Sequence, residues 1–168
     1  MSIEFSIFDL SRTYAGRKQF DCEHTVINKF VHDSMVSQVK RKLSLAYLLT
    51  DSASDDRIVG FFTVAHHSIS AASLSGLQLG SLPRSIPCTR LVMLGVDKVY
   101  KGKDLGRRLL KQALLLTKAA SNQMGCYGLY LDADSKALGF YLRLGFVLLE
   151  GDKSPPASPM FMPVASIA

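Results

Sequence analysis

Cysteine is scarce in this chain of 168 residues, and the three that occur, Cys22, Cys88 and Cys126, lie far apart. Their odd number and irregular spacing exclude a disulfide framework and a cysteine-based metal site. Long apolar runs are also missing, because Leu43–Leu49 and Leu109–Leu116 fall short of the ~20 residues that a membrane-spanning helix needs. The first residues lack the basic and then apolar pattern of a leader peptide, so we expect a cytoplasmic protein with reduced thiols.

The charge is unbalanced, with 20 Lys and Arg against 14 Asp and Glu and a net charge of +6. A surplus of this sign favours anionic partners such as nucleic acids and nucleotide cofactors. Hydrophobic residues make up 48% of the chain and charged residues 20%, which is typical of a globular protein and not of a disordered one. Neither a repeat nor an interdomain linker is visible, so we expect residues 1–168 to form one domain.

Hydrophobic periodicity predicts an alternation of strands and helices. We expect strands over residues 3–10, 45–50, 58–65, 90–96, 127–133, 146–149 and 160–164. We expect helices over residues 25–42, 105–120 and 137–144, with an apolar face in the first that includes Val26, and loops over Ser68–Ser81 and Ser154–Pro156. This order predicts an α/β fold with a mixed central sheet flanked by helices.

One segment, Leu94–Arg108, combines the end of a strand, a basic turn and the start of the longest helix. It contains neither a Walker A loop nor a Gly-x-Gly-x-x-Gly fingerprint. Such a turn directs several backbone N–H groups at one point, and the helix start adds a partial positive charge. The combination suits a phosphate group, although an ordinary helix start with solvated charges has the same spacing.

Two segments together resemble the GNAT acetyltransferases. Their acetyl-CoA motif, Arg/Gln-x-x-Gly-x-Gly/Ala, is matched by Lys101–Gly106, and their late Phe-Tyr-x-x-x-Gly-Phe motif is matched by Phe140–Phe146. The chain is most similar to the toxin branch of the TacT and AtaT type. The segments that carry this closer similarity are Phe20–Glu23, Ile27–Phe30, Gln38–Lys42 and Leu82–Pro87.

The resemblance implies the GNAT fold and an N-acetyltransferase that uses acetyl-CoA as the acetyl donor, with no metal. Tyr141 would be the general acid that protonates the leaving thiolate, and a substrate amine would attack the thioester directly. The resemblance assigns contacts with coenzyme A to Leu94, Gly95, Val96, Lys101, Gly102, Lys103, Asp104, Leu105, Gly106 and Arg107.

Three positions depart from the family pattern: Lys101 replaces Gln or Arg, and Asp104 and Glu23 replace Gly. Asp tolerates a left-handed backbone better than most residues. Its carboxylate near a diphosphate nevertheless costs on the order of 0.3–1 kcal/mol at an exposed helix start. We therefore expect a working site with weakened affinity for coenzyme A.

For the substrate, the resemblance implies the α-amine of aminoacyl-tRNA, whose acetylation blocks translation. It also implies a ribbon-helix-helix antitoxin and a homodimer. The candidate tRNA-binding residues are Lys40, Arg41, Lys42, Arg84 and Arg90. The general base is left open among His66, His67, Asp97 and no base at all, because an esterified amino acid has an amine that is largely neutral already.

Two other functions stay open at this point. The chain could acetylate a small-molecule or protein amine, but its carboxylates gather in the Asp51–Asp56 turn instead of beside the predicted site. It could also be a degenerate GNAT-fold binding module disabled by Asp104. No motif encodes which aminoacyl-tRNA would be modified.

Overall fold

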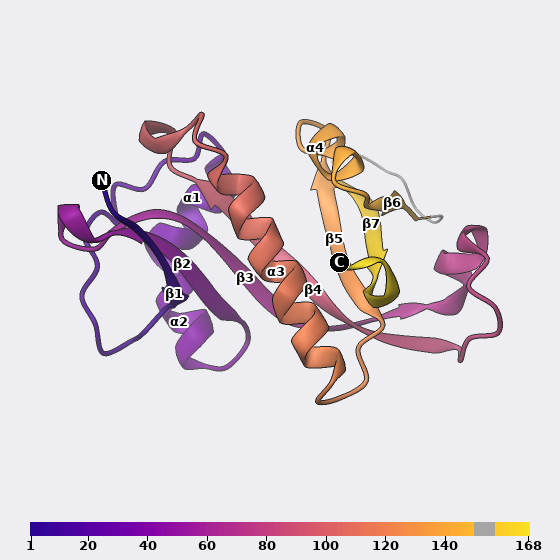
Figure 1. Cartoon of the computed structure of the whole chain (residues 1–168). Helices are drawn as coiled ribbons and strands as arrows, with labels where there is room; N and C mark the ends of the chain where they lie inside the picture. Colours follow the sequence, from indigo (N-terminus) through magenta and orange to yellow (C-terminus); the bar gives the residue numbers. More distant parts are fainter. Residues whose placement is uncertain (150–156) are drawn as a thin grey trace. The chain divides into compact units, whose positions relative to one another are not determined.

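The computed structural model describes residues 1–149 and 157–168, so the predicted loop Ser154–Pro156 lies outside the described residues. The strands of the described part are β1 (Ile3–Ile7), β2 (Leu45–Asp51), β3 (Arg57–Ser70), β4 (Ser85–Val96), β5 (Gly128–Asp134), β6 (Val147–Leu148) and β7 (Ala157–Pro163). The α-helices there are α1 (Thr25–Lys29), α2 (Met35–Lys40), α3 (Leu105–Ser121) and α4 (Leu138–Arg143) (Figure 1).

The strands form a mixed seven-stranded sheet in the order β1-β2-β3-β4-β5-β7-β6. β4 and β5 are parallel, whereas β1 with β2, β2 with β3, β5 with β7 and β6 with β7 are antiparallel. The predicted mixed sheet with flanking helices is therefore confirmed, and the strands and helices follow one another in the predicted order.

The chain divides into two compact units, residues 1–65 with 92–113 and residues 66–91 with 114–168. Each unit is discontinuous in sequence, because β3, β4 and α3 contribute residues to both. That residues 1–168 act as one domain stays a prediction.

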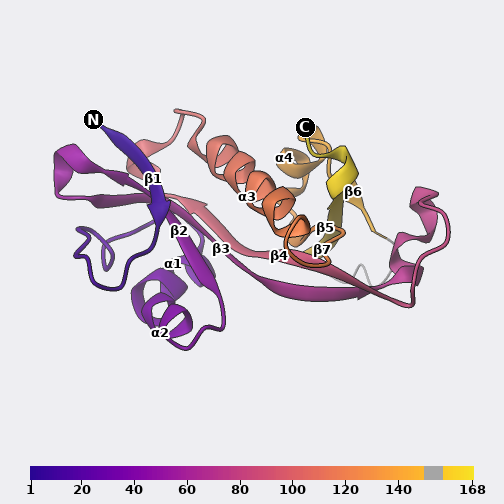
Figure 2. The same ribbon diagram turned by 60° about the horizontal axis from the view of Figure 1, so that its bottom comes forward.

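In the first unit, α1 and α2 cover one face of β2 and β3 (Figure 2). Val31, Met35 and Val39 are buried at four-residue intervals and belong to the same core as Leu48 and Phe61. This packing removes apolar surface from water at about 25 cal/mol per Å². It is the main reason that a segment so short holds a helical conformation.

The helix predicted over residues 25–42 is interrupted by one turn of π-helix, Phe30–Ser34, in which the Met35 N–H bonds to the Phe30 carbonyl. The predicted apolar face is wrong at Val26, whose side chain is 63% exposed. Val26 lies about 100° around the helix from Ile27, whose side chain packs against the core, so Val26 points to solvent. The core-facing residues recur every four positions, a spacing that drifts by about 40° per step, and the wider turn absorbs part of that drift.

In the second unit, the loop predicted over Ser68–Ser81 is only partly correct. β3 continues to Ser70, and the next residues form a 3₁₀ segment, η3 (Ala71–Leu77). A backbone bond of 3.0 Å from the Ala71 N–H to the Arg84 carbonyl closes this hairpin before β4. Leu74 is 2% exposed and lies in a core cluster with Ile86, so leucine anchors a stretch whose Ser and Gly content indicates a loop.

In helix α3, helical spacing predicts an apolar face of Leu105, Leu109, Ala113, Leu116 and Ala120. The first three are buried and the last two half-buried, while Leu110 and Thr117 beside that face are also buried. In the described part of the chain, no helix is both long and apolar enough to cross a membrane.

Gly128 provides a test of the close contact between β5 and β7. A Cβ atom at this position would lie 2.3 Å from the Met162 carbonyl oxygen and 2.5 Å from the Phe161 ring. Because the first neighbour is backbone, Gly128→Ala should reduce the free energy of unfolding by about 1–3 kcal/mol, as measured by urea denaturation. Gly125→Ala is the matched control, since its Cβ would meet only Pro87 at 3.5 Å. Equal stability of the two variants would contradict the packing described.

Candidate functional site

The turn between β4 and α3 has the backbone shape that the sequence predicts. After β4 ends at Val96, a short 3₁₀ segment, η4 (Lys98–Tyr100), leads to residues 101–104 and then to the start of α3. Gly102 and Asp104 both have left-handed φ angles, 81° and 61°. A Cβ atom at Gly102 would meet no heavy atom within 4 Å, so this turn faces open space.

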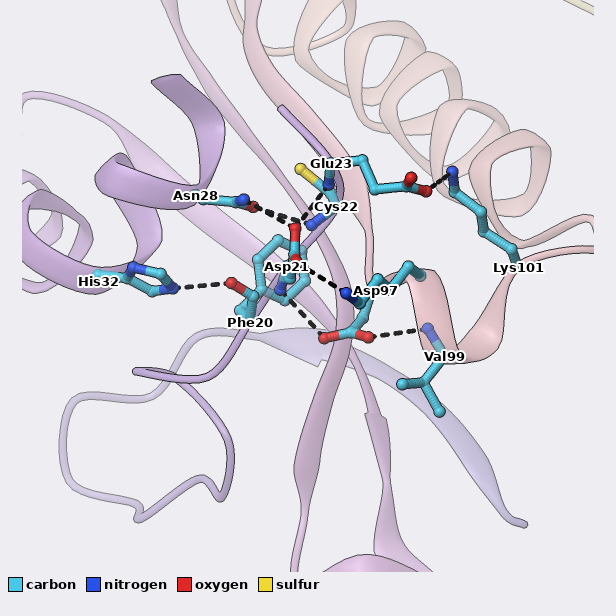
Figure 3. A network of polar contacts seen from close by, with 10 residues as sticks. Phe20, Asp21, Cys22, Glu23, Asn28, His32, Asp97, Val99 and Lys101 are labelled. Atoms are coloured by element: carbon cyan, nitrogen blue, oxygen red, sulfur yellow. Dashed lines mark hydrogen bonds and ion pairs between the residues drawn. The ribbon is translucent and has the colours of Figure 1, made fainter. Parts of the chain in front are cut away.

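A buried aspartate fixes the base of this turn. Asp97 is 2% exposed, and its carboxylate accepts hydrogen bonds from the Asp21 N–H at 3.2 Å and the Val99 N–H at 3.0 Å (Figure 3). Its own N–H donates to the Val59 carbonyl at 2.8 Å. These contacts give Asp97 a structural role and leave little reason to assign it as the general base.

A second buried group anchors the same turn. The Tyr100 hydroxyl donates to the Asp51 carboxylate at 3.2 Å, and that carboxylate also accepts from the Ser2 and Ala53 N–H groups. The bond from Ser2 is the largest of the effects that lower the pKa of Asp51. The carboxylates of the Asp51–Asp56 turn therefore hold loops in place. Asp56 in this turn pairs with Arg12 at 2.9 Å.

The cations of the turn differ in their surroundings. Lys98 pairs with Asp21 at 3.1 Å, and Lys101 forms an ion pair with Glu23. Lys103, Arg107 and Arg108 have exposed side chains at the start of α3. Backbone and side-chain hydrogen bonds from Glu23 and Asn28, and then from Lys98, lower the pKa of Asp21 to about 2, so this carboxylate is ionised at neutral pH.

These residues fit a diphosphate group. Left-handed residues before the start of a 17-residue helix are a backbone arrangement suited to an anion, and exposed cations lie beside it. Of the predicted contacts with the diphosphate, Lys101, Gly102, Lys103, Asp104 and Arg107 are exposed, Gly106 is half-buried, and Leu105 is buried under the helix.

The predicted pantetheine contacts lie on the last residues of β4. Leu94 and Val96 are half-buried and Gly95 is buried. A Cβ atom at Gly95 would lie 3.1 Å from the Cys22 Sγ and 3.2 Å from the Ile27 side chain. All three residues lie downstream of the register between β4 and β5, which covers Thr89 and Arg90.

Tyr141 lies on α4 in the second unit, only 8% exposed. Its ring packs edge-on against Phe140 at 5.1 Å and Phe146 at 5.5 Å between centroids. Burial, with a smaller contribution from Asp134, raises the pKa of Tyr141 well above its ordinary value. The hydroxyl therefore keeps its proton at neutral pH, which a proton donor requires, but its pKa is further from that of a thiol than the pKa of an ordinary phenol.

The start and end of α4 explain the position of this tyrosine. The Asp134 carboxylate accepts from the N–H groups of Lys136 and Ala137 at 3.0 and 2.9 Å, which begins the helix. Gly145, with φ of 97°, ends it, and the Phe146 N–H returns to the Tyr141 carbonyl at 3.1 Å.

Of the histidines considered as a base, His66 is exposed and His67 is half-buried. The His67 ring lies 4.7 Å from that of Tyr130, and burial, then the nearby Arg90, lowers its pKa. Arg90 is itself paired with Asp132 at 3.2 Å, and the Tyr130 hydroxyl donates to the same carboxylate at 2.8 Å. Arg90 is thus held within a polar cluster of the second unit.

The other candidate tRNA-binding residues fall on both units. Lys40, Arg41 and Lys42 form an exposed basic cluster at the end of α2, in the first unit. Arg84 is exposed just before β4, in the second unit.

The thiols have no features of a nucleophile. Burial raises the pKa of Cys88 to about 12 and also raises that of Cys22. Both thiols are protonated at neutral pH and correspondingly unreactive. Within residues 1–149 and 157–168, no group of three His, Cys, Asp or Glu side chains is placed to hold a metal ion.

The sequence does not indicate a role for Glu23, but the structure shows two notable features of this residue. Glu23 has a left-handed φ of 65° and its carboxylate contacts Lys101. The signal was available, because a position where the resembled proteins have Gly indicates a backbone with positive φ.

Comparison with known proteins places these features in a family. The model of the acetyltransferase (GNAT) domain matches residues 46–148. A tRNA-acetylating toxin of Mycobacterium tuberculosis is 29% identical over 99 residues, which cover 58% of this chain and 60% of the toxin. The probable toxin TacT of Sinorhizobium fredii is 29% identical over 152 residues, covering 80% of each chain.

Solved structures agree over almost the whole length. A structure described as a bacterial toxin has a TM-score of 0.93 and 35% identity, covering 98% of this chain and 92% of its own. AtaT in complex with acetyl-methionyl-tRNAfMet has a TM-score of 0.89 and 27% identity, covering 99% and 97%. A mutant of AtaT bound to the C-terminus of the antitoxin AtaR and acetyl-CoA has a TM-score of 0.84 and 26% identity, covering 99% and 96%.

The GNAT fold, the N-acetyltransferase class and the acetyl-CoA donor expected from the sequence are thereby confirmed. The chain belongs to the GNAT acetyltransferase family, in the toxin branch that includes TacT and AtaT.

Proposed function

We propose that the protein transfers the acetyl group of acetyl-CoA to the α-amine of an aminoacyl-tRNA and so blocks translation. The observation that carries the proposal is the exposed, basic turn of left-handed residues at the start of α3. It suits a diphosphate, and a solved structure has the related AtaT in complex with acetyl-methionyl-tRNAfMet.

Acetyl-CoA supplies an activated thioester. The N–H groups of residues 102–106, with Lys101, Lys103 and Arg107, bind the diphosphate, and the backbone of Leu94–Val96 aligns the pantetheine arm. Tyr141 then donates its phenolic proton to the departing sulfur. Its raised pKa keeps the hydroxyl protonated at neutral pH before the reaction.

The attacking amine needs little help from the protein. An α-amine has a pKa of about 7.7–8.0, so a substantial part of it is neutral at physiological pH. His67 is a second source of basicity, since its lowered pKa keeps the imidazole neutral. The three thiols take no part, and the acetyl group moves to the amine in one step.

The substrate and the relatives suggest the partners. An aminoacyl-tRNA substrate implies a cytoplasmic location. AtaT binds the C-terminus of its antitoxin AtaR, and we propose a comparable antitoxin of the ribbon-helix-helix type for this chain, which we expect to be a homodimer.

A small cationic amine is the second candidate substrate, and the structure favours it less. A site for such an amine needs available carboxylates. Asp51 is 3% exposed and committed to four hydrogen-bond donors, while Asp56 pairs with Arg12. A degenerate binding module is also less favoured, because Asp104 adopts the left-handed conformation that the turn requires.

The test is acetyl transfer in solution. The protein is incubated with [¹⁴C]acetyl-CoA and a full set of charged tRNAs, and label is followed in the aminoacyl group released by mild base. We expect labelled acetyl-amino acid from one or a few tRNAs. Label on polyamines or peptides alone would support the second candidate and contradict the first.

Replacing Tyr141 by Phe should lower kcat by about 10²–10⁴-fold, because a positioned general acid contributes on this scale. The ring contacts with Phe140 and Phe146 persist in the variant, so its thermal unfolding should match the wild type. Tyr127→Phe is the control for removing a hydroxyl in the same unit. A Tyr141→Phe enzyme of normal rate would rule out this acid.

Replacing Asp104 by Gly should tighten coenzyme A binding by about 1.5–5-fold, as measured by calorimetry, because it removes a carboxylate beside the diphosphate. Asp104→Asn separates charge from backbone freedom, since Asn also tolerates the left-handed conformation. If the Asn variant binds no better than the wild type, repulsion by the carboxylate is not the cause.

Replacing Lys40, Arg41 and Lys42 together by Ala should weaken binding of tRNA and flatten its dependence on salt. Each lost phosphate contact lowers the slope of log affinity against log salt by roughly 0.7–0.9. Filter binding at several salt concentrations measures the slope, and unchanged affinity for coenzyme A verifies the fold. An unaltered slope would place the tRNA elsewhere.

A further inference from the structure

An acidic segment lies against the cationic turn of the first unit. Figure 3 shows Asp21, Cys22 and Glu23 beside the residues that follow β4. The Lys98 N–H donates to the Asp21 carbonyl at 2.8 Å, and the Asp21 N–H donates to Asp97 at 3.2 Å. Backbone bonds therefore hold the two segments together independently of their charges.

The two ion pairs between these segments differ in kind. Asp21 has further partners for its carboxylate, accepting from the Glu23 N–H and the Asn28 side chain, each at 2.9 Å, as well as pairing with Lys98. The pair of Glu23 with Lys101 is peripheral, with side chains 55% and 56% exposed. Disrupting the first pair would disturb the loop, whereas the second pair can separate without moving the backbone.

We propose that Glu23 is an internal competitor for Lys101, and that binding of coenzyme A exchanges the Glu23 carboxylate for the diphosphate. This inference rests on the proposed function, because it takes the turn at the start of α3 as the diphosphate site. Glu23 is a positioning residue that lowers affinity for the donor, and it touches neither the thioester nor the amine.

The geometry supports a diphosphate that replaces Glu23 at Lys101, and not one that shares Lys101 with Glu23. Glu23 is held in a left-handed conformation, and its N–H bond to Asp21 fixes where its side chain begins. A lysine ammonium is a compact charge on a flexible stem, so it can turn from a carboxylate to a phosphate. The contact with Lys101 also lowers the pKa of Glu23, so the competing carboxylate is ionised at neutral pH.

The test is a double-mutant cycle on coenzyme A binding, measured by calorimetry at low salt. Glu23→Gln should tighten binding by about 1.5–5-fold, the scale of one exposed ion pair. In the Lys101→Ala background the same change should have little effect, because the competing contact is already gone. Thermal unfolding checks that each variant is folded.

Asp33→Asn is the matched control, because Asp33 forms a similarly exposed pair with Lys18 at 3.9 Å. It removes one negative charge from the same unit and should leave affinity unchanged. If Asp33→Asn tightened coenzyme A binding as much as Glu23→Gln, the cause would be the change in net charge. That result would overturn the inference.

Other outcomes separate the inference from the proposed function. Weaker or unchanged binding in Glu23→Gln, or equal tightening in the Lys101→Ala background, would overturn the competition while leaving the acetyltransferase site in place. A wild-type protein that binds no coenzyme A would overturn both.

Discussion

The carboxylate of Asp97 is the constraint on which the first unit depends. It lies at the end of β4, is buried, and takes hydrogen bonds from the loop before α1 and from η4, while its N–H bonds to β3. Removing it would take the acceptor from two part-buried N–H groups, those of Asp21 and Val99. Asp97 thus links β3, the loop before α1 and η4. It thereby determines where the cations that follow it in the chain lie.

Ion pairs reduce the part of the net positive charge that is available to bind an anion. Composition gives a net charge of +6, but contacts with Asp21, Glu23 and Asp132 pair several of the cations that the sequence associates with the site. The neighbouring carboxylates reduce the local field while they fix the lysine and arginine side chains. Whether an anion binds then depends more on which cations can leave their carboxylate partners than on the number of cations.

Much of the fold could be predicted because it follows from periodicity. The long helix α3 and its buried face are as expected, since five apolar or small side chains recur at helical spacing. The left-handed backbone at Asp104 was foreseen from its place in the motif. The N-acetyltransferase class could be predicted from the acetyl-CoA motif and the Phe-Tyr-x-x-x-Gly-Phe motif that follows it.

What could not be predicted depends on contacts distant in the sequence. The ion pair of Glu23 with Lys101 joins residues 78 positions apart. The 3₁₀ segment after β3 was missed because the Ser and Gly residues over Ser68–Ser81 indicate a loop, although Leu74 is its anchor.

The π-helical turn at Phe30–Ser34 has a consequence for how this surface can diverge. A homologue that lost one residue there could form a regular helix with the later side chains still on the core, because the wider turn holds one more residue in nearly the same rotation. A residue lost from α2 has no such turn to absorb it, and the basic end at Lys40–Lys42 would then be rotated by about 100°. The place of a length change, as much as the residue types, therefore determines where the charge is presented.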